Sequence, residues 1–143
     1  MTGKTHLSCG IATSLFLCGD VVSCILLSVG SLLPDIDHKN SLFGKALPFI
    51  PKMIKHRTWT HSLLFLILCY FINVYLCVGC CVHLFLDMMT KQGCPLFYPF
   101  DIKIKLPFAS LIKTDGKFEK LLFCISVLVI VFLIMRNIFH LFC

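Results

Sequence analysis

A histidine and an aspartate stand four residues apart in HLFLDMMT, residues 83–90, inside a strongly apolar segment. On an α-helix this spacing places His83 and Asp87 on one face, one turn apart, and Thr90 follows on that face. Two side chains so spaced can bind one metal ion. Because aspartate in a membrane segment is costly unless it is paired or bound to a cation, the pair indicates either a metal site or a His–Asp hydrogen bond in the core.

A second candidate motif is LPDIDH, residues 33–38, which ends the first apolar stretch of the chain. Its proline breaks the helix, so that Asp35, Asp37 and His38 follow where the chain reaches the membrane interface. Two carboxylates and an imidazole so close in sequence supply hard oxygen and nitrogen donors for a divalent cation. The simpler interpretation is a charged interfacial turn.

A third candidate motif is HRTWTHS, residues 56–62, which opens the second apolar stretch. It contains His56 and His61, and Thr60 can cap the helix that follows. The guanidinium of Arg57 suits a phosphate or a carboxylate. Taken alone, this motif can equally be a helix start at the membrane interface.

Apolar segments separate these motifs and must position them. The chain has 143 residues, of which 58% are hydrophobic and 14% charged, and its mean hydropathy is +0.92. This composition is typical of a membrane protein and fits one domain. The net charge of +6 comes from basic residues spread over two loops. Such loops indicate a cytoplasmic side facing anionic lipid, and no fold motif supports nucleic-acid binding.

Three apolar stretches stand out, at residues 7–33, 62–89 and 121–139. The last has about 20 residues and predicts a C-terminal transmembrane helix at about 121–139. As straight helices, the first two would each extend over roughly 40 Å, longer than the ~30 Å hydrocarbon core. They are therefore expected to fold back on themselves.

Helix-ending or costly residues interrupt the two long stretches: Gly19-Asp20 in the first and Asn73 in the second. We therefore predict an all-α membrane protein with two helical hairpins, at about 7–33 and 61–90, and a C-terminal transmembrane helix. Because a hairpin returns the chain to the side that it left, all the polar motifs are expected to gather on one membrane face.

The order of the motifs resembles that of the YdjM-like family. The resemblance is carried by H-x-x-x-G at His6 and Gly10, then LPDIDH, HRTWTHS, and HLFLDMMTKQG followed by PLFYPF, and it covers about residues 1–100. Members are small bacterial inner-membrane proteins described as LexA-regulated, membrane-bound, metal-dependent hydrolases. The resemblance implies a multi-pass protein of the bacterial inner (cytoplasmic) membrane, and the basic loops favour a cytoplasmic site.

The pattern is more distantly similar to the zinc-dependent phospholipase C and P1-nuclease group, an all-α fold with up to three zinc ions. This similarity implies five metal ligands: His6, Asp35, His61, His83 and Asp87. It also implies Asp37 as a further ligand or as a base beside the ligands. The N-terminal Trp and late His-x-x-x-Glu ligands of that group have no counterpart here. We therefore expect one or two ions, with zinc favoured and manganese or magnesium as alternatives.

These considerations divide the chain into three parts. Residues 1–100 are expected to form a membrane-embedded, metal-dependent hydrolase-like domain, residues 101–120 a basic loop, and residues 121–143 the C-terminal transmembrane helix. The expected partners are membrane lipids and a small phosphoester or lipid substrate. The sequence does not determine the oligomeric state.

The predicted function is hydrolysis of a phosphoester by a metal-activated water. Asp35 or Asp37 would orient the water or act as its base, and Arg57 would hold the phosphate. Thr60 and Thr90 would donate hydrogen bonds to the metal ligands.

Two other functions fit the same residues. The first is a non-catalytic membrane protein with a structural metal or a hydrogen-bonded His–Asp core. The second is a small transporter, which would explain Asp20 and Asp87 but lacks a repeated, lumen-lining pattern. An open coordination position would separate the alternatives, because catalytic metal sites keep one and structural sites are closed. The ligand set, rich in carboxylate and without cysteine, favours catalysis.

Overall fold

The computed structural model describes residues 1–53, 56–100, 102–107, 109 and 112–142. Over these residues the chain is helical, with isolated β-bridges but no strand, so the all-α prediction is confirmed there. The elements are α1 (Gly3–Leu17), α2 (Val21–Gly30), η1 (Leu33–Asp37), α3 (Leu42–Ala46), α4 (Ile50–Met53), η2 (Trp59–His61), α5 (Leu63–Ile72), α6 (Val74–Met88) and α7 (Lys117–Phe142), where η denotes a 3-10 helix.

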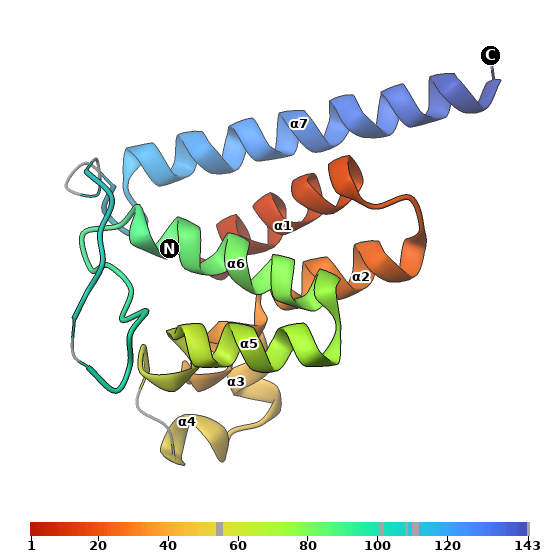
Figure 1. Ribbon diagram of the computed structural model, residues 1–143. Helices are drawn as coiled ribbons and strands as arrows, with labels where there is room; N and C mark the ends of the chain where they lie inside the picture. The colour runs from red at the N-terminus through yellow and green to blue at the C-terminus, as the bar shows by residue number, and fades with distance from the viewer. Residues whose placement is uncertain (54–55, 101, 108, 110–111, 143) are drawn as a thin grey trace.

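The five longer helices lie roughly along one common direction (Figure 1). Helix α2 packs against α6, α1 packs against both α2 and α7, and α5 packs against α6. The turns from α1 to α2 and from α5 to α6 lie at one end of the molecule, on the right of Figure 1. The N-terminus and the segment between α6 and α7 lie at the opposite end, so the residues that precede α1 and follow α6 meet there.

The polar residues that interrupt the apolar stretches act as helix caps. The carboxylate of Asp20 accepts a hydrogen bond of 2.9 Å from the backbone N–H of Ser23 and starts α2. The side chain of Asn73 accepts a bond of 2.8 Å from the N–H of Tyr75 and starts α6, while its own N–H ends α5. Each cap satisfies an N–H group that has no partner inside its helix.

Helices α2 and α6 approach each other through glycines. A Cβ atom added to Gly79 would overlap the backbone carbonyl of Leu27 and lie 2.8 Å from the Cα of Gly30. A Cβ added to Gly30 would in turn overlap the carbonyl of Leu76. Small residues that let two backbones come together are typical of helix packing in membranes, and this crossing places the end of α2 beside the middle of α6.

Helix α7 is long and apolar enough over Lys117–Phe139 to cross a membrane, and it is the one helix of the described chain with that property. It starts four residues before the predicted 121–139, inside the stretch predicted as a basic loop. Positions 101, 108, 110 and 111 of that predicted loop lie outside the described residues. The other predicted helix ends also differ: α1 begins at Gly3 and α6 ends at Met88.

A buried glutamate joins α7 to the start of α1. Glu119 is 2% exposed, and its carboxylate accepts hydrogen bonds from the backbone N–H of Thr2, the hydroxyl of Thr5 and the backbone N–H of Asp115. Seven residues further along α7, the hydroxyl of Ser126 lies 2.7 Å from that of Ser8. The first turn of α1 is therefore held against the first turns of α7.

We expect Glu119→Ala to lower the free energy of unfolding by about 2–3 kcal/mol, because hydrogen bonds to a buried charged group contribute about this much. Thermal unfolding in detergent, followed by circular dichroism, measures the change. Asp115→Asn is the matched control, since the Asp115 carboxylate is 77% exposed and, among the described residues, pairs with the exposed Lys120 at 3.7 Å. Equal melting temperatures for the two variants would contradict this role of Glu119.

Candidate metal centre

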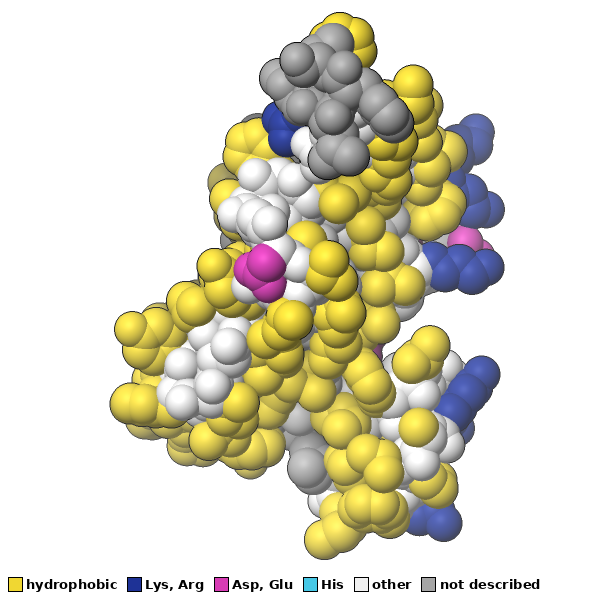
Figure 2. Space-filling view, turned by 90° about the vertical axis from the view of Figure 1, so that its right-hand side faces the viewer, with side chains coloured by type: hydrophobic (Ala, Val, Ile, Leu, Met, Phe, Trp, Pro, Cys, Tyr) yellow, Lys and Arg dark blue, Asp and Glu magenta, His cyan; other side chains and the backbone are white. Residues whose placement is uncertain are grey.

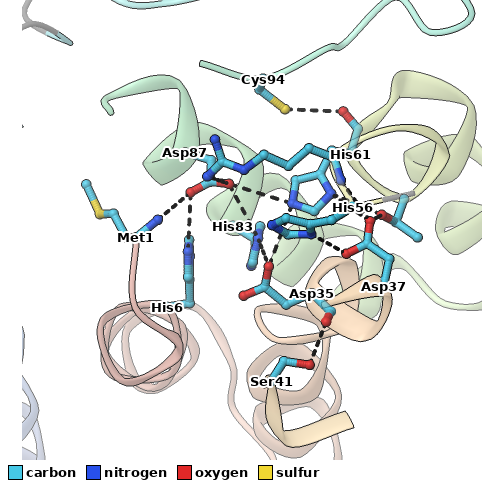
Figure 3. Close-up of polar contacts among 12 residues, drawn as sticks. Met1, His6, Asp35, Asp37, Ser41, His56, His61, His83, Asp87 and Cys94 are labelled. Carbon is cyan, nitrogen blue, oxygen red and sulfur yellow. Dashed lines mark hydrogen bonds and ion pairs between the residues drawn. The ribbon is translucent and has the colours of Figure 1, made fainter. Parts of the chain in front are cut away.

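Three histidines from three different elements converge beside the end of α6 (Figure 3). His6 comes from α1, His61 from η2 and His83 from α6, and each is at most 1% exposed. The rings of His6 and His83 stack with centroids 3.7 Å apart, and the centroids of His61 and His83 are 5.3 Å apart. Within the described residues, the Nε2 atom of each of the three is buried without a hydrogen-bond partner.

Two carboxylates face these nitrogen atoms. Asp35 Oδ1 lies 3.8 Å from His61 Nε2 and 3.7 Å from His83 Nε2. Asp87 Oδ2 lies 3.6 Å from His61 Nε2 and 4.0 Å from His83 Nε2, and Asp87 Oδ1 lies 3.5 Å from His6 Nε2. Ligands bound to one tetrahedral zinc at about 2.0–2.2 Å are roughly 3.3–3.6 Å apart. Two of the five distances lie in this range, and the other three are longer, up to 4.0 Å.

The orientation of His83 is fixed by a backbone carbonyl at the crossing of α2 and α6. His83 Nδ1 lies 2.7 Å from the carbonyl oxygen of Ser31, which can only accept a hydrogen bond, so Nδ1 is protonated. In the neutral imidazole, Nε2 then carries a lone pair that points toward Asp35 and Asp87. A lone pair facing two carboxylates is unfavourable unless a proton or a metal cation lies between them, and this set of donors fits a metal ion.

The described residues contain three groups that could hold a metal ion, and they overlap. One group contains Asp35, His61 and His83. A second contains His6, His83 and Asp87. Asp35 also belongs to a third group, with Asp37 and His56. The shared members make one connected cluster rather than three independent sites.

Asp37 is held by hydrogen bonds from the segment before α5. Its carboxylate lies 2.6 Å from His56 Nδ1 and accepts bonds from the backbone N–H of Arg57 at 3.0 Å and the hydroxyl of Thr60 at 2.5 Å. Burial acts to raise the pKa of Asp37, but hydrogen bonds from His56, His61 and Thr60 outweigh it and hold the pKa well below its usual range. Asp37 is therefore a buried carboxylate anion that orients the ring of His56.

Arg57 bridges this segment and α6. Its backbone has φ of 60°, a left-handed conformation that costs a non-glycine residue of order 1–3 kcal/mol. This conformation directs the N–H to Asp37 and the guanidinium to Asp87 Oδ2 at 2.7 Å and to the carbonyl of Gly93 at 3.2 Å. The amino group of Met1 donates to the other oxygen of Asp87 at 2.6 Å.

Cys94 lies beside the centre but does not belong to any of its metal-holding groups. Burial, and then the negative charge of Asp87, raises the pKa of the Cys94 thiol to about 12. The neutral thiol donates to the carbonyl of His61 at 3.2 Å. Because metals bind the thiolate, Cys94 is assigned a structural role.

The structure brings together all five side chains that the distant similarity named as ligands. His6, which carries little signal in the sequence, is as deeply buried as the others. Asp37 and Arg57 lie directly against this cluster. The roles assigned to these seven residues remain predictions.

Sequence reasoning missed two features of the centre. His56 was noted in HRTWTHS but not assigned a role, and only its contact with Asp37 brings it to the site. No sequence signal marks Ser31, because it acts through its backbone. Of the two predicted threonine donors, Thr60 contacts His61 Nδ1 at 3.0 Å, whereas the Thr90 hydroxyl donates to the backbone carbonyl of Asp87.

Comparisons with known proteins reach over most of the chain. A family model described as YdjM inner membrane protein matches residues 1–139. The chain is 36% identical over 126 residues to the uncharacterized protein YvsG of Bacillus subtilis, covering 75% of this chain and 79% of YvsG. It is 30% identical over 137 residues to the inner membrane protein YdjM of Escherichia coli, covering 75% of this chain and 70% of that protein. No solved structure matches significantly, and the distant likeness to the phospholipase C and P1-nuclease group gains no support.

Proposed function

This chain belongs to the YdjM inner membrane protein family, and from that premise we propose that it is a membrane-bound, metal-dependent hydrolase acting on a phosphoester. The supporting observation is the convergence of three buried, unpartnered histidine nitrogens on the carboxylates of Asp35 and Asp87. Leaving such atoms without a partner costs about 1–3 kcal/mol each, and a bound cation removes that cost.

The ion would be held by four residues: His61, His83, Asp35 and Asp87. His6, which lies beside Asp87, would be a further ligand. The sequence leaves one or two ions open; we propose one, because the third group shares Asp35 and contains His56, which this proposal uses as the base. Zinc suits this mixture of imidazole and carboxylate, with manganese or magnesium as alternatives. When bound, such an ion polarises a phosphoryl group and lowers the pKa of a water.

The residues around the cluster have distinct roles in this proposal. His56 is half-buried and its ring is oriented by the buried carboxylate of Asp37, an arrangement suited to accepting a proton from water. Asp37 therefore positions the base rather than acting as one. The guanidinium of Arg57, whose Nε has no partner among the described residues, binds the phosphate.

We propose that the pairs α1–α2 and α5–α6 are hairpins embedded in the bacterial inner membrane and that α7 crosses it. The hairpin helices have 10 to 15 residues. Helices of this length reach about 15–22 Å, less than the ~30 Å hydrocarbon core. Figure 2 shows the end of the molecule that carries the hairpin turns, and its surface is mainly hydrophobic. Several α5 side chains are exposed and apolar: Leu64, Ile67, Leu68, Phe71 and Ile72.

A structural metal is the alternative, because the three histidines are almost fully buried. Two features favour catalysis: Asp35 is 15% exposed, and a cavity reaches it together with His56 and Arg57. A closed structural site would have no such access.

The test is release of nitrophenolate from p-nitrophenyl phosphate and bis-p-nitrophenyl phosphate by purified protein loaded with zinc or manganese. We expect His56→Gln to lower kcat by about 10²- to 10⁴-fold, the usual contribution of a general base, while metal content is retained. Metal measured on the same samples is the internal control. A wild-type protein that binds metal stoichiometrically but releases no product from any phosphoester would support the structural alternative.

A further inference from the structure

We propose that the substrate is a membrane lipid with a phosphorylated headgroup, bound in the cavity between the first turns of α1 and α7 and the segment from η1 to α3. This inference rests on the proposed function and names its substrate class. The cavity has a volume of about 920 Å³, which lies at the upper end of the range for small-molecule sites. Its walls come from segments far apart in the sequence.

At one place the cavity meets the metal centre, through Asp35 alone of the five expected ligands. Asp35, His56 and Arg57 line it there, so a phosphate at this place meets the guanidinium and the His–Asp pair. Asp35 also faces the unpartnered nitrogens of His61 and His83. The reacting group of a substrate therefore belongs at this place.

Other parts of the cavity wall are apolar. Leu7 belongs to α1 and Phe123 to α7, whereas Leu32 precedes η1 and Leu42 begins α3. Phe123 lies within the stretch of α7 that is able to cross a membrane. These side chains are half-buried or exposed, so they offer hydrocarbon contact to the acyl chains of a lipid.

Two lysines also belong to the lining, as do Asp115 and Glu119. Lys4 on α1 and Lys120 on α7 both line the cavity and are exposed. Lys120 pairs with Asp115 at 3.7 Å, but that pair is exposed and contributes little. Lysines in the lining favour an anionic headgroup, and a soluble phosphoester would leave the apolar walls without a contact.

Binding of an unreactive analogue tests this without requiring turnover. The probe is a dioctanoyl lipid phosphonate, in which carbon replaces the ester oxygen, and the comparison is the same headgroup without acyl chains. Native mass spectrometry of metal-loaded protein released from detergent gives both affinities. We expect the lipid to bind at least about tenfold more tightly, the effect of burying a few methylene groups.

Matched substitutions locate the site. Lys120→Glu is expected to weaken lipid binding about tenfold, whereas Lys117→Glu, the same change one turn earlier and outside the cavity, leaves it within about twofold. Phe123→Ala is expected to weaken it about tenfold, with Phe118→Ala as the exposed control.

Two outcomes would overturn the lipid assignment: equal affinity for the soluble headgroup, or equal effects of the cavity and control substitutions. Failure of the proposed function gives a different pattern. In that case no phosphoester is hydrolysed, yet the lipid phosphonate binds and the substitutions at Lys120 and Phe123 weaken it, which supports the lipid site alone. Hydrolysis of soluble phosphoesters without lipid preference would uphold the function and reject the lipid.

Discussion

Replacing His83 or Asp87 with alanine is expected to abolish stoichiometric metal binding. Both side chains are at most 1% exposed, and each belongs to the convergent groups of donor atoms. Removing a partner of a metal ligand already lowers affinity by about 10- to 100-fold, so loss of a ligand itself is expected to exceed about 100-fold. Elemental mass spectrometry of detergent-purified protein, after incubation with zinc and removal of free metal, measures this directly.

His38→Ala is the matched control for this experiment. His38 lies near the cluster, with its ring 4.7 Å from that of His56, but it belongs to none of the metal-holding groups found in the described residues. It is therefore expected to retain metal. His83→Gln and Asp87→Asn nearly keep the side-chain volume and therefore separate loss of a ligand from misfolding. Circular dichroism checks that their helix content is unchanged. Retention of zinc by folded His83→Gln and Asp87→Asn would exclude the cluster as a metal centre.

Gly79→Ala is expected to destabilise the protein by about 1–3 kcal/mol, the usual cost of overpacking. Alanine gains up to about 1 kcal/mol over glycine in helix propensity, but here the added Cβ would overlap the backbone carbonyl of Leu27. A backbone carbonyl cannot turn away as a side chain can, so α2 and α6 must move apart. Because Ser31 at the end of α2 orients His83, metal affinity is expected to fall as well.

Thermal unfolding in detergent, with and without zinc, measures both effects of Gly79→Ala. Gly19→Ala is the control, since a Cβ at Gly19 meets nothing within 4 Å. If Gly79→Ala were as stable as the wild type and bound zinc equally, close packing of α2 on α6 would not position the centre.

Local patterns allowed part of this structure to be predicted. The spacing of His83 and Asp87 placed both on one face of α6, because helix geometry fixes that relation. Gly19-Asp20 and Asn73 predicted where the apolar stretches are interrupted, because capping is a property of a few adjacent residues.

Contacts that depend on distant segments could not be predicted in this way. The sequence does not show that the oxygens of Asp37 meet residues 19 to 23 positions later in the chain. Arg57 was expected to meet a phosphate, and its bond to Asp87 requires a left-handed backbone that nothing in the motif indicates. The partner of His83 is a backbone carbonyl 52 residues away, which leaves no trace in residue type.

The contacts of Glu119 also set the order in which the protein can be completed during its synthesis. Glu119 bonds to Thr2 and Thr5, which lie 117 and 114 positions earlier. A nascent chain cannot make these bonds until the start of α7 has left the ribosome, and closing so long a loop is entropically unfavourable. The first turn of α1, which also meets α6 through His6 and His83, therefore gains its contacts with α7 last, after the residues of η1, η2 and α6 have already been made.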